Sequence, residues 1–234
     1  MNYQKNLKYF ESNDKHFYTG LGILGVAVIL FALTVFFHVR MFRFQEVAIM
    51  VIAAAGAITA FVPLSYRSSE AEIEEAIAQK TAGYEEQVID STGITGLIPG
   101  KLKSTVTGDY VYDAEGIILR KGKDDRKYRS TLYKSCALIF TKYGIYVAQK
   151  VFSLIEDKEV EESAQFGYDD LDGVSVVDKE IGVGEGVSIK MTFLVFIENG
   201  KEALYVPIKS GATTDRFASD INHYIEEVKQ SAKA

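Results

Sequence analysis

The chain has 234 residues, of which 47% are hydrophobic and 25% are charged, and its formal net charge is −6. This acidic balance is opposite to the basic footprint of nucleic-acid-binding domains, so we expect no nucleic acid duplex as a partner. The single cysteine, Cys136, excludes an internal disulfide framework and a cysteine-rich metal site, which favours a reducing compartment for the polar part of the chain.

Two long stretches near the N-terminus carry no charged residue. They are residues 17–37 (FYTGLGILGVAVILFALTVFF) and residues 47–66 (VAIMVIAAAGAITAFVPLSY). At a rise of about 1.5 Å per residue, each is long enough as a helix to cross a hydrocarbon core roughly 30 Å thick. The alternative for each stretch is a buried core helix. The connection between them is short, so we expect a transmembrane hairpin with both of its outer ends on one side of the bilayer.

Basic residues divide unequally around these two stretches. Five flank the outer ends and two lie in the connecting loop: Lys5, Lys8, Lys15, Arg67 and Lys80 against Arg40 and Arg43. Basic residues favour the cytoplasmic side. The pattern predicts a two-helix protein of the cell membrane with both termini in the cytoplasm and residues 1–16 as an N-terminal tail.

Small residues predict how the two helices pack. They lie on the second stretch as Ala53, Gly56, Ala57 and Ala60, with Gly22 and Gly25 on the first as the expected receiving surface. Small side chains allow two helix backbones to approach closely. The same surfaces leave a homo-oligomer open as an alternative. Neither stretch contains Asp, Glu, Lys, Arg or His, which disfavours a transporter or a channel.

Residues 67–100 form the predicted connection to the rest of the chain. Ser69 and Glu72 have the spacing of a capping box, so a helix is expected to begin there and to dock on the domain that follows. Residues 91–100 (STGITGLIPG) contain three glycines and a proline, a composition typical of a hinge or loop.

Residues 101–234 show the short β-branched and aromatic runs of a β domain. The expected strands are 104–113, 116–120, 137–141, 145–152, 174–177, 188–197 and 203–208. The connections at 142–144 and 199–200 predict hairpins. Residues 213–230 then carry one apolar stripe, which predicts an amphipathic C-terminal helix that covers the sheet. The fold class is α+β, with a sandwich or partly open barrel of about seven strands.

This domain resembles the bacterial pleckstrin-homology-like domains, which are often joined to a pair of membrane helices. The resemblance rests on the hairpin ALIFTKYGIYVAQKV, the stretch FGYDDLDGVSVVDK, a long hairpin and the final helix. It covers about half of the chain, and the acidic insertion IEDKEVEES departs from the simplest members. The resemblance implies a binding or scaffolding module and transfers no catalytic residue.

One basic cluster is the candidate binding site of this domain. It consists of Arg120, Lys121, Lys123, Arg126, Lys127 and Arg129, interrupted by two aspartates. Beside an anionic leaflet, each basic residue would contribute on the order of 1 kcal/mol to binding lipid head groups. The stretch from Lys123 to Arg129 is also similar to the basic loop by which some pleckstrin-homology domains hold phosphorylated lipids. The alternative is a solvated hairpin with ordinary surface charge.

The other residue patterns in the sequence do not indicate a catalytic or metal site. The glycines of GVGEG (residues 182–186) are expected in a hairpin loop, and the acidic run 156–162 in a solvated loop. The three histidines lie far apart, which disfavours a metal site. We therefore expect no enzyme and no cofactor. The leading hypothesis is a membrane-anchored module that binds a protein partner or the membrane surface. The alternative is a sensor whose β domain binds a small ligand, such as a nucleotide messenger, and drives assembly of the helices.

Overall fold

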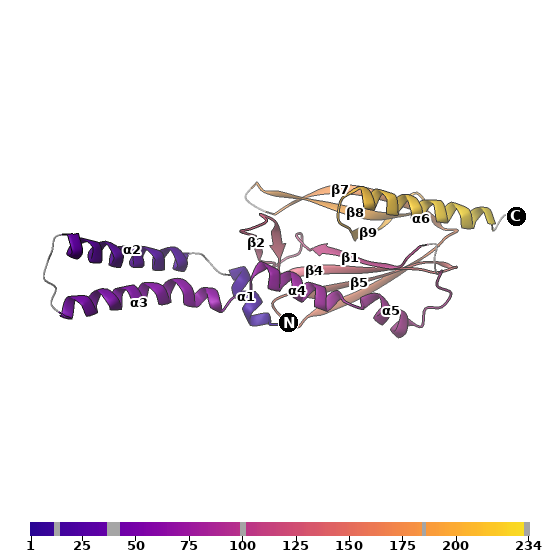
Figure 1. The fold of residues 1–234 in the computed structure, drawn as a ribbon. Helices are drawn as coiled ribbons and strands as arrows, with labels where there is room; N and C mark the ends of the chain where they lie inside the picture. Colours follow the sequence, from indigo (N-terminus) through magenta and orange to yellow (C-terminus); the bar gives the residue numbers. More distant parts are fainter. Residues whose placement is uncertain (12–14, 37–42, 99–101, 184–185, 232–234) are drawn as a thin grey trace. The chain divides into compact units, whose positions relative to one another are not determined.

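The computed structural model describes residues 1–11, 15–36, 43–98, 102–183 and 186–231. The chain divides into two compact units, a helical unit of residues 2–69 and a mixed unit of residues 70–234 (Figure 1). The class is α+β, as predicted.

The helical unit contains the two predicted apolar helices. Its elements are α1 (Tyr3–Glu11), α2 (Lys15–Phe36) and α3 (Arg43–Ser65). Helices α2 and α3 run side by side as an antiparallel pair (Figure 1). Both are long and apolar enough to cross a membrane, with mean hydropathies of 2.4 and 1.9 in their most apolar windows. Only 11% of each window is buried, whereas the core helix of a soluble domain is mostly buried.

Backbone contact between α2 and α3 is made through small residues. A Cβ atom added to Gly20 would lie 2.4 Å from the backbone nitrogen of Ala60, and one added to Gly56 would lie 2.9 Å from that of Leu24. Gly56 and Ala60 are buried as the sequence indicates, and Ala53 and Ala57 are half-buried beside them. The predicted face of the second helix is therefore the one that packs.

The predicted receiving surface on the first helix is wrong. Gly22 and Gly25 meet nothing within 4 Å, and Gly20 and Leu24 receive α3 in their place. Successive residues of a helix are rotated by about 100°, so Gly20 and Leu24 share a face while Gly22 lies about 200° away from Gly20. The sequence shows three glycines in α2 but not which of them faces α3.

Helix α1 occupies most of the segment expected to be a polar tail. Ser68 donates a hydrogen bond from Oγ to Asn6 Oδ1 at 2.7 Å and another from its amide to the Lys5 carbonyl at 3.1 Å. Lys8 Nζ lies 5.4 Å from the centre of the Tyr66 ring. These contacts join the chain before α2 to the chain after α3. The two outer ends of the helix pair thus lie together, as the short connection predicts.

The expected linker helix is two helices. These are α4 (Glu70–Thr81), which begins directly after Ser69, and α5 (Tyr84–Thr92). Gly83, with φ at 68°, lies between them in the left-handed region, which glycine adopts without steric cost. Tyr84 and Val88 of α5 pack on Ala137, Ile139 and Ala148 of the β domain. The expected docking of this segment on its own domain is confirmed.

Nine strands form three antiparallel sheets in the described part of the chain. Their bounds are β1 (Thr105–Tyr110), β2 (Leu119–Lys121), β3 (Tyr128–Ser130), β4 (Leu132–Phe140), β5 (Gly144–Ser153), β6 (Glu159–Gly167), β7 (Leu171–Gly182), β8 (Ser188–Glu198) and β9 (Lys201–Pro207). The orders are β1-β4-β5-β6, β2-β3 and β7-β8-β9. No closed barrel forms among these strands. The predicted hairpins at 142–144 and 199–200 are the β4–β5 and β8–β9 connections.

The acidic run is the clearest error in the predicted strands. Most of it lies in β6, an edge strand that pairs with β5 along its whole length. The solvated-loop prediction failed because edge strands tolerate exposed charges, which also discourage pairing with other chains. Lys150 Nζ holds Glu161 at 2.8 Å, and Lys80 Nζ holds Glu159 at the same distance. The loop predicted for GVGEG does join β7 to β8, although Gly184 and Glu185 lie outside the described residues.

The main core of this unit lies between the two larger sheets. Leu138 and Phe140 of β4, Val147 of β5, and Leu194 and Phe196 of β8 are all buried in it. Helix α6 (Ala212–Ser231) adds its predicted apolar stripe to this core and runs along β7 (Figure 1). The capping role predicted for the C-terminal helix is thus confirmed.

A side-chain amide fixes α6 to the edge of the three-stranded sheet. Asn222 Oδ1 accepts the Val174 amide at 2.7 Å, and Asn222 Nδ2 donates to the Val174 carbonyl at 2.8 Å. A Cβ atom on the neighbouring Gly173 would lie 2.8 Å from Asn222 Oδ1. Asn222 therefore satisfies the outward backbone groups of Val174 as a neighbouring strand would.

Candidate functional site

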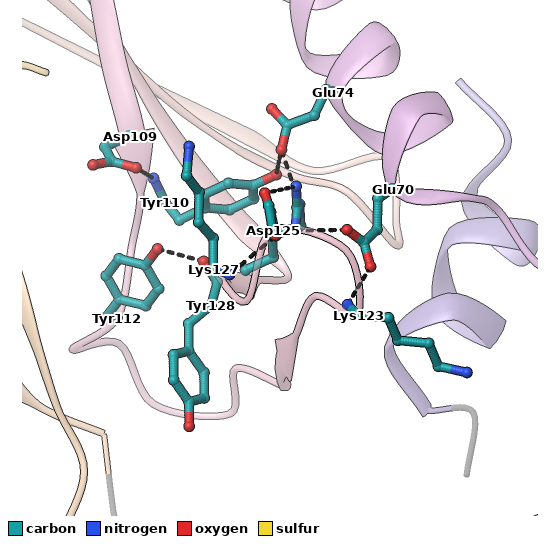
Figure 2. A network of polar contacts seen from close by, with 10 residues as sticks. Glu70, Glu74, Asp109, Tyr110, Tyr112, Lys123, Asp125, Lys127 and Tyr128 are labelled. Carbon is teal, nitrogen blue, oxygen red and sulfur yellow. Dashed lines mark hydrogen bonds and ion pairs between the residues drawn. The ribbon is translucent and has the colours of Figure 1, made fainter. Parts of the chain in front are cut away.

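Arg129 is the centre of a network of charged side chains on one side of the mixed unit. It lies on β3, and its side chain is only 4% exposed. Its Nε lies 2.8 Å from Glu74 Oε1, its Nη2 lies 2.9 Å from Asp125 Oδ2, and its Nη1 lies 3.1 Å from Asp125 Oδ1 and 3.5 Å from Glu70 Oε2. Figure 2 shows these three carboxylates converging from α4 and the β2–β3 connection. We call this arrangement the Arg129 cage.

Neighbouring groups complete the Arg129 cage. Tyr110 on β1 donates from its hydroxyl to Glu74 Oε1 at 3.0 Å, and Glu70 Oε1 accepts the Lys123 amide at 2.6 Å (Figure 2). A Cβ atom on Gly122 would lie 2.6 Å from Arg129 Nη1, so a side chain at this position would displace the guanidinium. The cage therefore ties α4, β1 and the β2–β3 hairpin to one another.

Charge and burial shift the pKa values of the acids and phenols around the cage in different directions. The hydrogen bonds from the Arg129 guanidinium lower the pKa of Asp125. Burial raises the pKa of Asp109, although the amide of Tyr110 opposes this shift by donating to its carboxylate. Burial also raises the pKa of Tyr110 far above its ordinary value, and the Glu74 charge adds to that effect. The phenol of Tyr110 is thus a permanent hydrogen-bond donor here.

The predicted basic cluster divides into one buried and several exposed cations. The prediction that Arg129 belongs to a lipid-binding surface is corrected. Three carboxylates surround its buried guanidinium, so this cation is not available to a ligand. The two acidic partners on α4 are 55 and 59 positions away in sequence, and no local spacing indicates them. Arg120 is half-buried on β2.

The remaining members of the cluster are exposed on the β2–β3 hairpin. They are Lys121, Lys123, Arg126 and Lys127. Lys121 Nζ lies 5.3 Å from the centre of the Tyr128 ring. Arg126 has a φ of 59°, an unusual backbone for a residue other than glycine. The amide of Lys127 donates to Asp125 Oδ1 at 3.0 Å, so the cage also holds the turn that presents these cations.

A cleft of about 820 Å³ lies beside this hairpin. Arg126 and Lys127 line it together with Lys190 of β8 and Lys209, which follows β9. Glu74, Asp109 and Asp125 also line it, and Lys190 Nζ is held 2.8 Å from Asp178 Oδ2. Sequence reasoning missed Lys190 and Lys209 because they come from a different sheet. The cleft is thus polar with mixed charge rather than uniformly basic.

A second cleft of about 680 Å³ lies on the other side of Gly108. Residues 102–108, which include most of β1, form one wall, and Phe217 of α6 and Ile208 lie on the other. Between the two clefts, Thr107 donates from Oγ1 to the Pro207 carbonyl at 3.0 Å. Both clefts therefore lie along the line where β1 meets the end of β9.

Residues considered for other chemistry are dispersed. Cys136 is fully buried in the core, where burial raises the pKa of its thiol to about 12. His16 lies on α2 and His223 on α6, while His38 lies outside the described residues.

Comparison with known proteins finds no match for this chain, whether among protein-family models, curated sequences or solved structures.

Proposed function

We propose that the protein is a membrane-anchored binding module. In this proposal α2 and α3 cross the cell membrane as a hairpin, and the mixed unit lies in the cytoplasm, where it engages a protein partner or the membrane surface. The observation that carries the proposal is the exposure of the apolar helix pair. The large apolar side chains of α2 and α3 point outward, as Val28 (65% exposed), Phe31 (57%) and Ile58 (61%) illustrate. Water would strongly disfavour such a surface, whereas hydrocarbon solvates it.

The cytoplasmic orientation rests on the division of basic residues around the helix pair. The contacts of Ser68 with α1 support it indirectly, because they bring the two more basic flanks together. A shared flank rich in Lys and Arg favours the cytoplasmic side.

A pleckstrin-homology-like assignment of residues 101–234 is part of the proposal. Two antiparallel sheets packed around one apolar core, with a C-terminal helix along one edge, support it. The space between the sheets is filled by the domain's own side chains, among them Phe166 and Phe196, whose rings stack at 5.0 Å. Ligands of this domain are thus expected on its surface, which fits a binding module.

Lipid head groups or an acidic partner surface would meet the exposed cations of the β2–β3 hairpin. Reversing Lys123, Arg126 and Lys127 to glutamate should weaken binding of the full-length protein, held in neutral nanodiscs, to anionic vesicles in a co-flotation assay. The control variant reverses three exposed lysines outside this hairpin, namely Lys142, Lys158 and Lys201. Because both variants change the net charge equally, equal binding by the two would remove lipid contact from the proposal.

The anchor is tested by charged substitutions at matched exposure. Ile29 and Ile58 on the helix pair are 60% and 61% exposed, and Val160 on β6 is 62% exposed. A lysine in the middle of a membrane span costs about 2.5–3.5 kcal/mol. The Ile29→Lys/Ile58→Lys variant should lose retention in carbonate-washed membranes, and Val160→Lys should keep it. If the unaltered chain is found in the soluble fraction, the anchor is wrong.

A second candidate function is a sensor that binds a small ligand and drives assembly of the membrane helices. The 820 Å³ cleft favours it, because its tyrosines, cations and hydroxyls could hold a polar ligand. Screening the full-length protein against nucleotides by thermal shift tests this function. A ligand that stabilises the unaltered protein but not the Lys127→Glu variant would support the sensor.

A further inference from the structure

Among the described residues, no strand forms ladder hydrogen bonds with the outer edge of β1. The four-stranded sheet has the order β1-β4-β5-β6, and β1 pairs only with β4. Exposed strand edges carry unpaired amide and carbonyl groups that can pair with another chain. This edge differs from that of β7, whose outward groups at Val174 are satisfied by Asn222.

The register shows which backbone groups of β1 point outward. Just beyond β1, Val111 donates its amide to the Leu132 carbonyl at 3.0 Å, so Val111 and Leu132 occupy a hydrogen-bonded position of the ladder. Paired residues in antiparallel strands alternate between bonded and non-bonded positions. In the continuous register of β1 with β4, Val106, Gly108 and Tyr110 therefore direct their backbone groups away from β4. The amide of Tyr110 is taken by Asp109 Oδ1 at 2.8 Å, which agrees with this direction.

The outward groups of Val106 and Gly108 lie along the 680 Å³ cleft. Residues 102–108 form one wall of it, and the opposite wall carries the half-buried apolar side chains of Ile208 and Phe217. A strand placed in this cleft would direct alternate side chains toward that apolar wall. The cleft thus offers both of the features that hold an extended peptide, a free strand edge and a side-chain pocket.

Charge determines which peptide fits. The charged residues that line the cleft are Lys103, Lys209 and Asp220, a net charge of +1 in a chain of −6. Lys103 and Lys209 are exposed, so they are accessible to a partner. An extended segment with acidic residues around a short apolar centre would complement both the lysines and the apolar wall.

We propose that this domain binds an acidic, extended peptide segment of a partner protein by adding it as a strand to the edge of β1. This inference rests on the proposed binding function and specifies its partner. The peptide backbone pairs with Val106 and Gly108, its apolar side chains contact Phe217 and Ile208, and its acidic residues lie near Lys103 and Lys209.

The test measures binding of a fluorescent EEVTVEE peptide to the full-length protein in detergent, by anisotropy. The peptide should bind, and its KKVTVKK counterpart should bind at least about tenfold more weakly, as reversed charges predict. Two further peptides carry N-methyl groups on one or the other set of alternate amides. One of the two must lose binding, because one set faces β1. Absence of EEVTVEE binding, or binding by both N-methylated peptides, overturns the proposal.

Variants of the protein locate the peptide on β1. Val106→Pro removes an amide that points away from β4, so the ladder with β4 keeps its hydrogen bonds while affinity should fall about tenfold. Val106→Ala is the matched control, because it removes the side chain and keeps the amide. Lys103→Glu/Lys209→Glu gives an independent measurement should Val106→Pro fold poorly, and it should also lower affinity about tenfold. Unchanged affinity in the lysine variant overturns the proposal.

Peptide binding in detergent is independent of whether α2 and α3 cross a membrane. Loss of peptide binding with retention in carbonate-washed membranes would refute the inference alone. A soluble chain that still binds the peptide would refute the anchor alone.

Discussion

Apolar side chains occupy opposite positions in the two units of this protein. In the helical unit, Phe31 is 57% exposed, and the α2–α3 contact is made by Gly20, Gly56 and Ala60. In the mixed unit, Phe196 is fully buried and small residues are not concentrated at the core. The difference shows two ways of holding elements together. Exclusion of water stabilises the β domain, whereas close approach of backbones holds a helix pair that hydrocarbon would surround.

The same substitution in the two units tests this difference most directly. Phe196→Ala removes a buried ring stacked on Phe166 and should cost about 3–5 kcal/mol of unfolding free energy, because burial is lost and a cavity is left. Phe31→Ala removes an exposed ring and should leave the stability of the β domain unchanged. Urea unfolding of both full-length variants in detergent measures the two values. Equal destabilisation would contradict the division into two differently stabilised units.

Disruption of the Arg129 cage is expected to cause the next largest loss of stability. Arg129→Met leaves Glu74, Asp125 and Glu70 without their shared cation and should destabilise the mixed unit by about 3 kcal/mol. This value is at the lower end for a buried pair, because half of the Glu74 side chain is exposed. Arg126→Met is the matched control, since Arg126 is exposed on the same hairpin. Thermal unfolding of the two variants should differ clearly, and similar midpoints would show that the cage contributes little.

Two glycines of α2 provide a smaller and more local test. Gly20→Val forces a side chain into the backbone of α3 and should destabilise the helix pair by about 1–3 kcal/mol, as overpacking does. Gly22→Val makes the same change in helix propensity but meets open space. Unfolding in mixed micelles of increasing SDS content, followed by helical circular dichroism, compares them. A larger effect at Gly22 would mean that the pair packs through the other face.

Substitutions of two aspartates near the cage should have the smallest effects on stability, and these effects should be of opposite sign. Burial raises the pKa of Asp109 above the unfolded value of 3.8, so its ionised form disfavours folding at neutral pH. Asp109→Asn should therefore stabilise the protein at pH 7, and the gain should disappear as pH falls toward 3.8. The pKa of Asp125 is lowered from the same value of 3.8. The ionised Asp125 carboxylate therefore stabilises the fold above pH 3.8. This contribution is lost as the pH falls through the pKa of Asp125 in the folded protein.

Thermal unfolding at several pH values distinguishes the two aspartates. Asp125→Asn should destabilise the protein at pH 7 and approach the unaltered protein under acid conditions. The same sign of change for both variants at pH 7 would contradict the assignment of burial to Asp109 and of ion pairing to Asp125.

Sequence reasoning found the elements whose residues repeat regularly. The two apolar helices, the hairpins at 142–144 and 199–200, and the amphipathic α6 all follow from local periodicity. It missed β6 because the edge position makes its glutamates acceptable, and only the pairing with β5 shows that position. Helix α1 carries a local signal, since Tyr3, Leu7 and Phe10 are at helical spacing.

The candidate site was harder to predict because it is assembled from distant parts of the chain. The basic run is visible in sequence, but whether Arg129 is free depends on Glu70 and Glu74, which α4 brings to it. The cleft lysines Lys190 and Lys209 likewise join Lys127 only through packing of the sheets. Local patterns identify charges, whereas tertiary packing decides which of them remain available.

The two hydrogen bonds between Asn222 and Val174 require a side-chain amide, which can both accept and donate. Hydrolysis of the side-chain amide to a carboxylate would preserve its shape, but both oxygens would then accept hydrogen bonds and neither could donate. The carbonyl of Val174 would lose its partner, and a negative charge would face it. A single deamidated residue would thus loosen α6 and open the edge of β7 to other molecules.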